Sequence, residues 1–257
     1  GHQTFTIREG WLHKGMQFLM SELEEDRNKL VDEYAADYLG VGRNMAKSIN
    51  HWLLATGLAE KKTEPGKNWK LKDTKYLIPN KNGFPEVIWK KDPYFLDAGT
   101  WWLIHINMVN SSSDAATWGW FFNNFHLDRF QKQVCLQSLI RYESLQGGRN
   151  PSETTLDRDL SCFLNTYSKE IPSKKKDPED EIESPLVELN LMNYYRSSGY
   201  FQVQRDKKNI NLYLFLYALQ KSLEVKEIEY DHDFLELPFF DLVKLENGPG
   251  RVFALSN

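Results

Sequence analysis

Residues 32–62, DEYAADYLGVGRNMAKSINHWLLATGLAEKK, constrain the fold of this chain more than any other segment. Their pattern predicts two short helices joined by a tight turn, as in a helix-turn-helix. Ala36 is small enough for two helices to approach closely, and Gly40 can adopt the positive φ that a sharp exit from a helix needs. Apolar residues recur at helical spacing and are expected to face the core: Leu39, Val41, Ala46, Ile49 and Leu53.

The polar side chains of the second helix should face outward, where a recognition helix contacts a DNA groove. They are Arg43, Asn44, Lys47, Ser48 and His51. Arg43 or Asn44 can read base edges, whereas Lys47 would neutralise a phosphate. The next segment, residues 61–78, is basic and rich in turn formers, which predicts a two-stranded wing. From this wing we expect phosphate contacts by Lys61, Lys62, Lys67 and Lys70, and stacking of Trp69 on an unpaired base.

Charge is distributed unevenly along the chain. Residues 43–91 contain eleven basic and four acidic residues, a net charge of +7. The whole chain carries −4, so the remainder carries −11. A basic segment on an acidic protein is typical of a surface that meets nucleic acid. Helix-turn-helix and winged-helix units also mediate protein–protein contacts, so a protein-interaction scaffold is an alternative.

Composition indicates an ordered protein with a substantial core. The chain has 257 residues, of which 41% are hydrophobic and 14% aromatic. No run approaches the roughly 18 apolar residues of a membrane span, and no signal peptide is recognisable. Cys135 and Cys162 lack CxxC spacing and lie in apolar contexts, which predicts buried thiols. We therefore expect a cytoplasmic protein without an organic cofactor.

The predicted fold is mainly α with small β-hairpins, with winged-helix-like units around a helical middle region. We expect an N-terminal winged-helix DNA-binding unit at residues 3–90 and a helical middle region at 91–171. A hydrophilic linker at 172–184 would lead to a C-terminal α/β winged-helix-like unit at 185–257. Within the middle region, residues 151–167 suggest either a second helix-turn-helix pair or an ordinary helical hairpin, with Ser152 as a helix N-cap.

No standard catalytic motif is present, and the catalytic and metal-binding residues are not assigned by the sequence. Cleavage of a phosphodiester assisted by Mg²⁺ or Mn²⁺ needs carboxylates and a group that activates water. Weak candidates for these roles are Asp92, Asp97, His105, Asp114, His126 and Asp128. Each also has a structural explanation. Asp97 can cap a helix, Asp92 can form a turn, and His105 lies among apolar residues typical of a core.

Five segments resemble one bacterial family and follow each other in the expected order. They are IREGWLHKG (7–15), LGVGRNMAKSINHWLLATGL (39–58), KDPYFLDAGTWWLIH (91–105), TLDRD (155–159) and ESPLVELNL (183–191). Together they are similar to the SspB-like family, a domain-of-unknown-function family encoded beside PAPS-reductase-like sulfurtransferases in DNA phosphorothioation loci. The resemblance implies a cytoplasmic phage-defence protein that nicks or engages DNA so that sulfur can replace a phosphate oxygen. The resemblance does not assign a catalytic residue in this sequence.

The sequence thus favours a DNA-binding component of a phosphorothioation system, with DNA and a sulfurtransferase as partners. A nicking endonuclease that uses Mg²⁺ or Mn²⁺ is the expected activity. One alternative is a non-enzymatic DNA-binding adaptor or regulator that recruits the sulfurtransferase. The other is the protein-interaction scaffold. Both DNA-binding hypotheses require that the basic helix and the basic hairpin project together from the acidic remainder of the protein.

Overall fold

The computed structural model describes residues 1–31, 33–64, 74–111, 113–147, 151–172, 184–205, 208–225 and 244–255. Three of the predicted DNA contacts, Lys67, Trp69 and Lys70, lie outside the described residues, as does most of the predicted linker. The chain divides into two compact units, Gly1–Ile104 and His105–Asn257. Each unit is described separately below.

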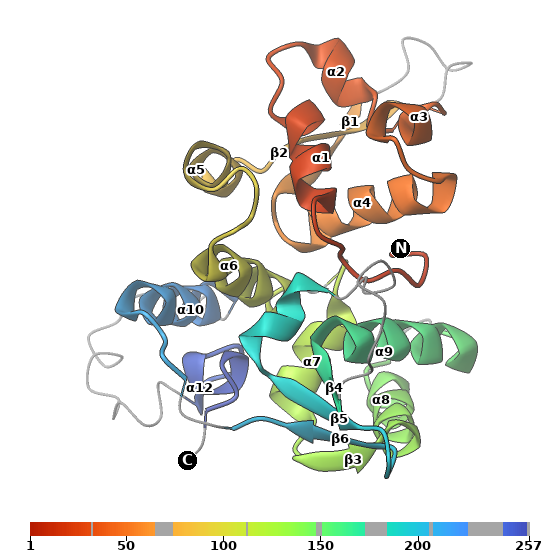
Figure 1. Ribbon diagram of the computed structural model, residues 1–257, viewed down its shortest axis with the longest axis vertical. Helices are drawn as coiled ribbons and strands as arrows, with labels where there is room; N and C mark the ends of the chain where they lie inside the picture. Colours follow the sequence, from red (N-terminus) through yellow and green to blue (C-terminus); the bar gives the residue numbers. More distant parts are fainter. Residues whose placement is uncertain are drawn as a thin grey trace. The chain divides into compact units, whose positions relative to one another are not determined.

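The first unit is built from short helices and one β-hairpin (Figure 1). Its helices and strands are α1 Trp11–Leu19, α2 Glu24–Asn28, α3 Ala35–Leu39, α4 Arg43–Ala55, β1 Ala59–Glu64, β2 Thr74–Pro79, α5 Phe84–Lys91 and the start of α6 Ala98–Val109. The predicted helix pair is therefore confirmed as α3 and α4. The hairpin that follows is antiparallel, with Ala59 opposite Pro79 and Glu64 opposite Thr74.

The turn between α3 and α4 forms for the reason that the sequence indicates. Gly40 has φ 63°, and its left-handed conformation lets the Val41 N–H donate to Ala36 O at 3.0 Å. The Lys14 ammonium of α1 donates to Leu39 O at 3.1 Å and so satisfies another carbonyl at this helix end. Leu39, Ala46, Ile49 and Leu53 are buried, as predicted, whereas Val41 is half-buried.

Helices α1 and α4 pack closely because Gly15 has no side chain. A Cβ at this position would lie 2.8 Å from Leu53 Cδ1 and 3.1 Å from Ile49 Cγ2. The close approach buries the apolar stripe of α4 against α1, and these residues form the core of the unit. The order of two helices followed by a hairpin matches the predicted winged-helix unit in its elements. The winged-helix assignment itself stays a prediction.

The second unit combines helices with one four-stranded sheet (Figure 1). It contains the rest of α6 and then α7 Ala116–Asn124, β3 Arg129–Gln131, α8 Lys132–Leu145, α9 Glu153–Tyr167, β4 Ser168–Ile171, the 3₁₀ helix η1 Pro185–Leu189, β5 Met192–Tyr195, β6 Tyr200–Val203, α10 Leu212–Val225 and α12 Pro249–Val252. The fold is thus mainly helical with two small sheets, as predicted in outline.

The four-stranded sheet joins the predicted middle region at 91–171 to the predicted C-terminal unit at 185–257. Its strand order is β3-β6-β5-β4, with β4 parallel to β5 and the other pairs antiparallel. The β5–β6 hairpin lies within the predicted C-terminal unit at 185–257. However, β3 and β4 belong to the predicted middle region, and they border the hairpin on both sides. The middle and C-terminal segments therefore form one unit, which differs from the predicted boundary at 172–184.

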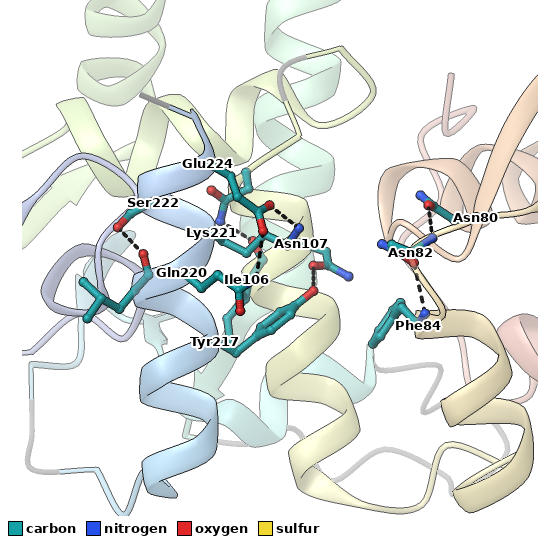
Figure 2. A network of polar contacts seen from close by, with 12 residues as sticks. Asn80, Asn82, Phe84, Ile106, Asn107, Tyr217, Gln220, Lys221, Ser222 and Glu224 are labelled. Atoms are coloured by element: carbon teal, nitrogen blue, oxygen red, sulfur yellow. Dashed lines mark hydrogen bonds and ion pairs between the residues drawn. The ribbon is translucent and has the colours of Figure 1, made fainter. Parts of the chain in front are cut away.

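Helices α7 and α9 build an aromatic core in the second unit. Phe163 of α9 lies 4.5 Å from Phe121 and 5.4 Å from Trp118, measured between ring centroids. Phe130 of β3 packs against Phe125 with its ring at 4.8 Å. Helix α10 also reaches α6, because the Tyr217 hydroxyl donates to Asn107 Oδ1 at 2.7 Å (Figure 2). Burial raises the pKa of Tyr217 to about 12, so this donor keeps its proton.

Residues 153–167 form the single helix α9, which packs against α8 as in the ordinary helical hairpin that was the alternative to a second helix-turn-helix pair. Ser152 caps α9 as predicted by accepting from Thr155 N at 3.2 Å. Pro249 begins α12, since proline is well suited to the first turn of a helix.

The cysteines behave as predicted. Cys135 and Cys162 are both buried free thiols, and burial raises the pKa of each well above its usual value. Among the described residues, no helix is both long and apolar enough to cross a membrane.

Candidate nucleic-acid interface

The first two turns of α4 present polar side chains to solvent. Arg43, Asn44 and Lys47 are exposed, and Arg43 and Lys47 are one helical turn apart on the same side. Neither cation forms an ion pair with any other residue that the structure describes. Positive charge without a carboxylate partner is available to an incoming phosphate.

The later turns of α4 are covered, so two predicted DNA contacts do not face outward. Ser48 and His51 are buried, and the prediction that both are exposed is wrong. The Ser48 hydroxyl donates to His2 O at 2.9 Å, and the His51 ring lies 5.6 Å from the His2 ring. The Trp52 indole N–H donates to Phe5 O at 3.1 Å and fixes the same segment. Residues 1–5 therefore lie over this side of the helix.

The two hairpin lysines predicted to contact DNA that the structure describes, Lys61 and Lys62, point to opposite faces. Lys61 and Lys62 are both exposed, but successive side chains of a strand alternate between faces. Lys62 lies opposite Tyr76 in the ladder, and its ammonium is 5.3 Å from the centroid of the Tyr76 ring. Lys61 lies opposite Leu77 on the other face. A polyanion on one side of the hairpin therefore meets one of these lysines.

A pocket of about 280 Å³ opens beside the basic end of α4. The helix contributes one stripe of side chains to the wall: Arg43, Ala46, Lys47 and Asn50. Spacings of three, four and seven residues place them on one side of a helix. The opposite wall comes from α3 and the residues before it: Leu30, Val31, Glu33, Ala35 and Ala36. Asn50 and Glu33 were not among the predicted site residues, although the same helical spacing groups Asn50 with Arg43 and Lys47.

Asn50 is the most constrained polar group of this pocket. Its side-chain N–H donates to Leu30 O, which fixes the orientation of the amide. Its Oδ1 is buried and accepts no hydrogen bond from any described residue. A buried acceptor without a donor costs free energy, so this oxygen favours a ligand that supplies an N–H or O–H.

In the first unit, the candidate catalytic carboxylates stabilise the backbone. Asp92 accepts from Leu96 N at 2.9 Å and from Asp97 N at 3.0 Å, and so holds a turn. Asp97 accepts from Gly99 N at 2.6 Å at the start of α6, the helix-capping role considered for it. Both carboxylates have a structural role that explains their presence.

His105 is a core histidine. It is completely buried, its Nε2 lies 2.8 Å from Val252 O and its Nδ1 2.8 Å from the Tyr167 hydroxyl oxygen. A carbonyl can only accept, so Nε2 carries the proton and Nδ1 accepts from Tyr167. Burial lowers the pKa of His105 to about 4, and the nearby charge of Lys208 adds to this effect. The ring is therefore neutral at pH 7 and links α6, α9 and α12.

The remaining candidates, Asp114, His126 and Asp128, have partners within the second unit. Asp114 accepts from the Ser113 hydroxyl at 3.0 Å, and Asp128 forms an ion pair with Arg205. His126 Nδ1 lies 3.3 Å from a guanidinium nitrogen of Arg251. Across the described ranges, no three His, Cys, Asp or Glu side chains are grouped so that they could hold a metal ion. The six candidates therefore do not come together as one set of metal ligands within the described ranges.

The family of the chain follows from a match along all 257 residues. Residues 1–257 match the family model described as "Protein of unknown function (DUF4007)". The chain belongs to this family. Two crystal structures of SspB, one of them magnesium-ion-bound, are similar to this DUF4007 chain with TM-scores of 0.79 and 0.78. Each is 21% identical in sequence, and each match covers 99% of this chain and 72% of the SspB chain.

These comparisons confirm the resemblance to the SspB-like family at the level of the fold. At 21% identity they establish the fold of this DUF4007 member and leave its activity to experiment. No curated protein matches the chain.

Proposed function

We propose that the chain is the DNA-binding component of a bacterial DNA phosphorothioation system that acts in phage defence. The observation that carries the proposal is the exposed pair Arg43 and Lys47 on the first turns of α4, neither of which forms an ion pair with a described residue. The SspB-like fold and the order of the family segments support the biological setting. The contact surface is smaller than a full recognition helix, since only the first two turns of α4 are accessible.

Arg43 and Lys47 would bind neighbouring phosphates of a duplex, and Asn44 would reach the edge of the groove. Each cation that neutralises a phosphate releases condensed counterions, so affinity falls as salt is added. Either Lys61 or Lys62 adds a further phosphate contact, depending on which face of the hairpin meets the DNA. Phosphate contacts hold the protein on DNA but do not by themselves select a sequence.

Salt titration of DNA binding tests this surface. For a fluorescently labelled duplex, we expect the double substitution Arg43→Ala/Lys47→Ala to weaken binding and to reduce the slope of log K against log[salt] by about 2. The matched control is Lys90→Ala/Lys91→Ala, which removes the same charge from exposed positions of α5 in the same unit. Equal losses in both variants would show that only net charge matters and would remove α4 from the interface.

We further propose that the chain nicks DNA to open the backbone for sulfur incorporation. The alternative is an adaptor that binds DNA and recruits a sulfurtransferase without cutting. Incubation of the protein with supercoiled plasmid and Mg²⁺ or Mn²⁺ separates the two. A nickase converts the plasmid to the open circle, whereas bound but uncut plasmid supports the adaptor.

A further inference from the structure

The pocket between α3 and α4 has the chemistry of a nucleotide site. We propose that it binds one nucleoside monophosphate unit whose base carries an amino group. The placement of this unit in a DNA strand rests on the proposed function, whereas the chemistry of the pocket does not. Three features of the pocket support this ligand: its size, its two cations and its two hydrogen-bond acceptors.

Size and shape favour a small planar group. A volume of about 280 Å³ lies just below the range of pockets for drug-sized ligands. Three alanines, Ala35, Ala36 and Ala46, line it and leave a smooth apolar surface. A base ring buried against such a surface loses contact with water on its face, which stabilises binding.

The cations lie where a phosphate is needed. Arg43 and Lys47 belong to the same stripe of α4 as Asn50, with Asn50 the most distant from the helix N-terminus. A ligand with one anionic end and one end that donates hydrogen bonds can therefore lie along this stripe. The guanidinium of Arg43 matches the geometry of phosphate oxygens, and Lys47 adds a second charge.

The acceptors determine which base fits. Asn50 Oδ1 is buried without a described donor, and the Glu33 carboxylate also lines the pocket. Adenine, cytosine and guanine carry an exocyclic amino group with two N–H donors, whereas thymine has a single ring N–H flanked by two carbonyls that a carboxylate and an amide oxygen would repel. We therefore expect bases with an amino group to bind about tenfold more tightly than thymine, as expected for one hydrogen bond made or lost.

Titration with free nucleotides tests the pocket independently of DNA. With the full chain, dAMP and dCMP should bind about tenfold more tightly than dTMP. Ala36→Leu should abolish this binding because the larger side chain fills the pocket. Ala98→Leu is the matched control, since Ala98 is exposed at the start of α6. Equal binding of the three nucleotides, or unchanged binding by Ala36→Leu, would overturn the proposal.

Protection of a lysine locates the ligand on the unaltered protein, so the test does not depend on the folding of a variant. An amine-reactive reagent with mass-spectrometric readout should modify Lys47 more slowly when dAMP is present. Lys90 is exposed on α5 and serves as the internal control. If dAMP slows the modification of neither lysine, or slows both to the same extent, the nucleotide does not bind in this pocket.

A duplex that contains 2-aminopurine distinguishes a base extruded from DNA from a free nucleotide. Its fluorescence rises when the base leaves the stack, so an increase on binding that Ala36→Leu abolishes identifies DNA as the source. If the chain binds duplex DNA but neither dAMP nor 2-aminopurine occupies the pocket, the nucleotide site is refuted and the DNA-binding proposal stands. Binding of dAMP by a chain that does not bind duplex would refute the proposed DNA function and leave a free-nucleotide site.

Discussion

Single residues in this protein link segments that are far apart in the sequence. His105 connects three helices through its two ring nitrogens, and the bond that Nδ1 accepts from Tyr167 requires the neutral ring. The group was a catalytic candidate because histidine is the usual proton-transfer residue near neutral pH. Its burial and its two partners instead explain it as part of the core of the second unit.

The depressed pKa of His105 makes stability dependent on pH. In the unfolded chain the ring takes up a proton near its usual pKa of about 6.5, whereas in the folded protein it does so only near 4. The unfolded state binds more protons in this window, so stability is lost as pH falls from about 6.5 to 4. Between pH 7 and pH 5, His105 should lower the free energy of unfolding by about 2 kcal/mol.

Urea unfolding of the wild type and of His105→Gln at pH 7 and pH 5 measures the contribution of His105 to the free energy of unfolding. Glutamine keeps one donor and one acceptor but does not titrate, so the variant should lose about 2 kcal/mol less between the two pH values. The same pH dependence in both proteins would show that His105 is not held neutral.

Residues with local roles were predictable, and those with distant partners were not. Gly40, Asp97 and Ser152 act within a few residues of their own position, so sequence spacing identified them. The burial of Ser48 and His51 depends on the segment at residues 1–5, more than forty positions away. No helical periodicity contains that information, because α4 alone gives both residues a polar face.

At the scale of elements, close helix contacts depend on glycine. A Cβ on Gly119 of α7 would lie 2.8 Å from Val109 O, a backbone atom at the end of α6. Asn123, one turn later, donates to Asn247 Oδ1 at 2.5 Å and accepts from Asn247 N at 2.7 Å. These contacts fix α7 against α6 and against the segment before α12.

Gly119→Ala should therefore destabilise the protein by about 1–3 kcal/mol, even though alanine is the better helix former by about 1 kcal/mol. Gly15→Ala is the matched comparison, because its new Cβ would meet the end of the flexible Leu53 side chain instead of backbone. Thermal unfolding of the two variants should show the larger loss for Gly119→Ala. A smaller loss at Gly119 than at Gly15 would contradict the rigid contact between α6 and α7.

Helices with a regular apolar pattern were identified from sequence, whereas short strands were not. Helix α4 follows from its periodicity. The strands β3 and β4 have three and four residues, too few for an alternating pattern, and each pairs with residues distant in sequence. Their existence depends on the tertiary structure.

At the scale of the whole molecule, the four-stranded sheet determines how the chain divides. Strands β5 and β6 lie at its centre, between β3 and β4. Phe201 of β6 stacks on Phe130 of β3 with ring centroids 5.8 Å apart. The predicted boundary at 172–184 followed from composition, which reports hydrophilicity but not strand pairing.

Truncation after residue 172 should therefore disrupt the second unit, since β3 and β4 would lose their neighbours and Phe130 would become exposed. We expect loss of the cooperative unfolding transition of this unit by circular dichroism, with the full chain as reference. A truncated chain that keeps this transition would show that residues 105–172 fold independently.

Because Lys61 and Lys62 lie on opposite faces of the hairpin, labels at these two positions report which face a bound molecule contacts. A photo-reactive group attached at one position reaches only molecules docked on that side, and the adjacent position samples the reverse side. Two neighbouring labels can thus establish from which direction a bound strand approaches.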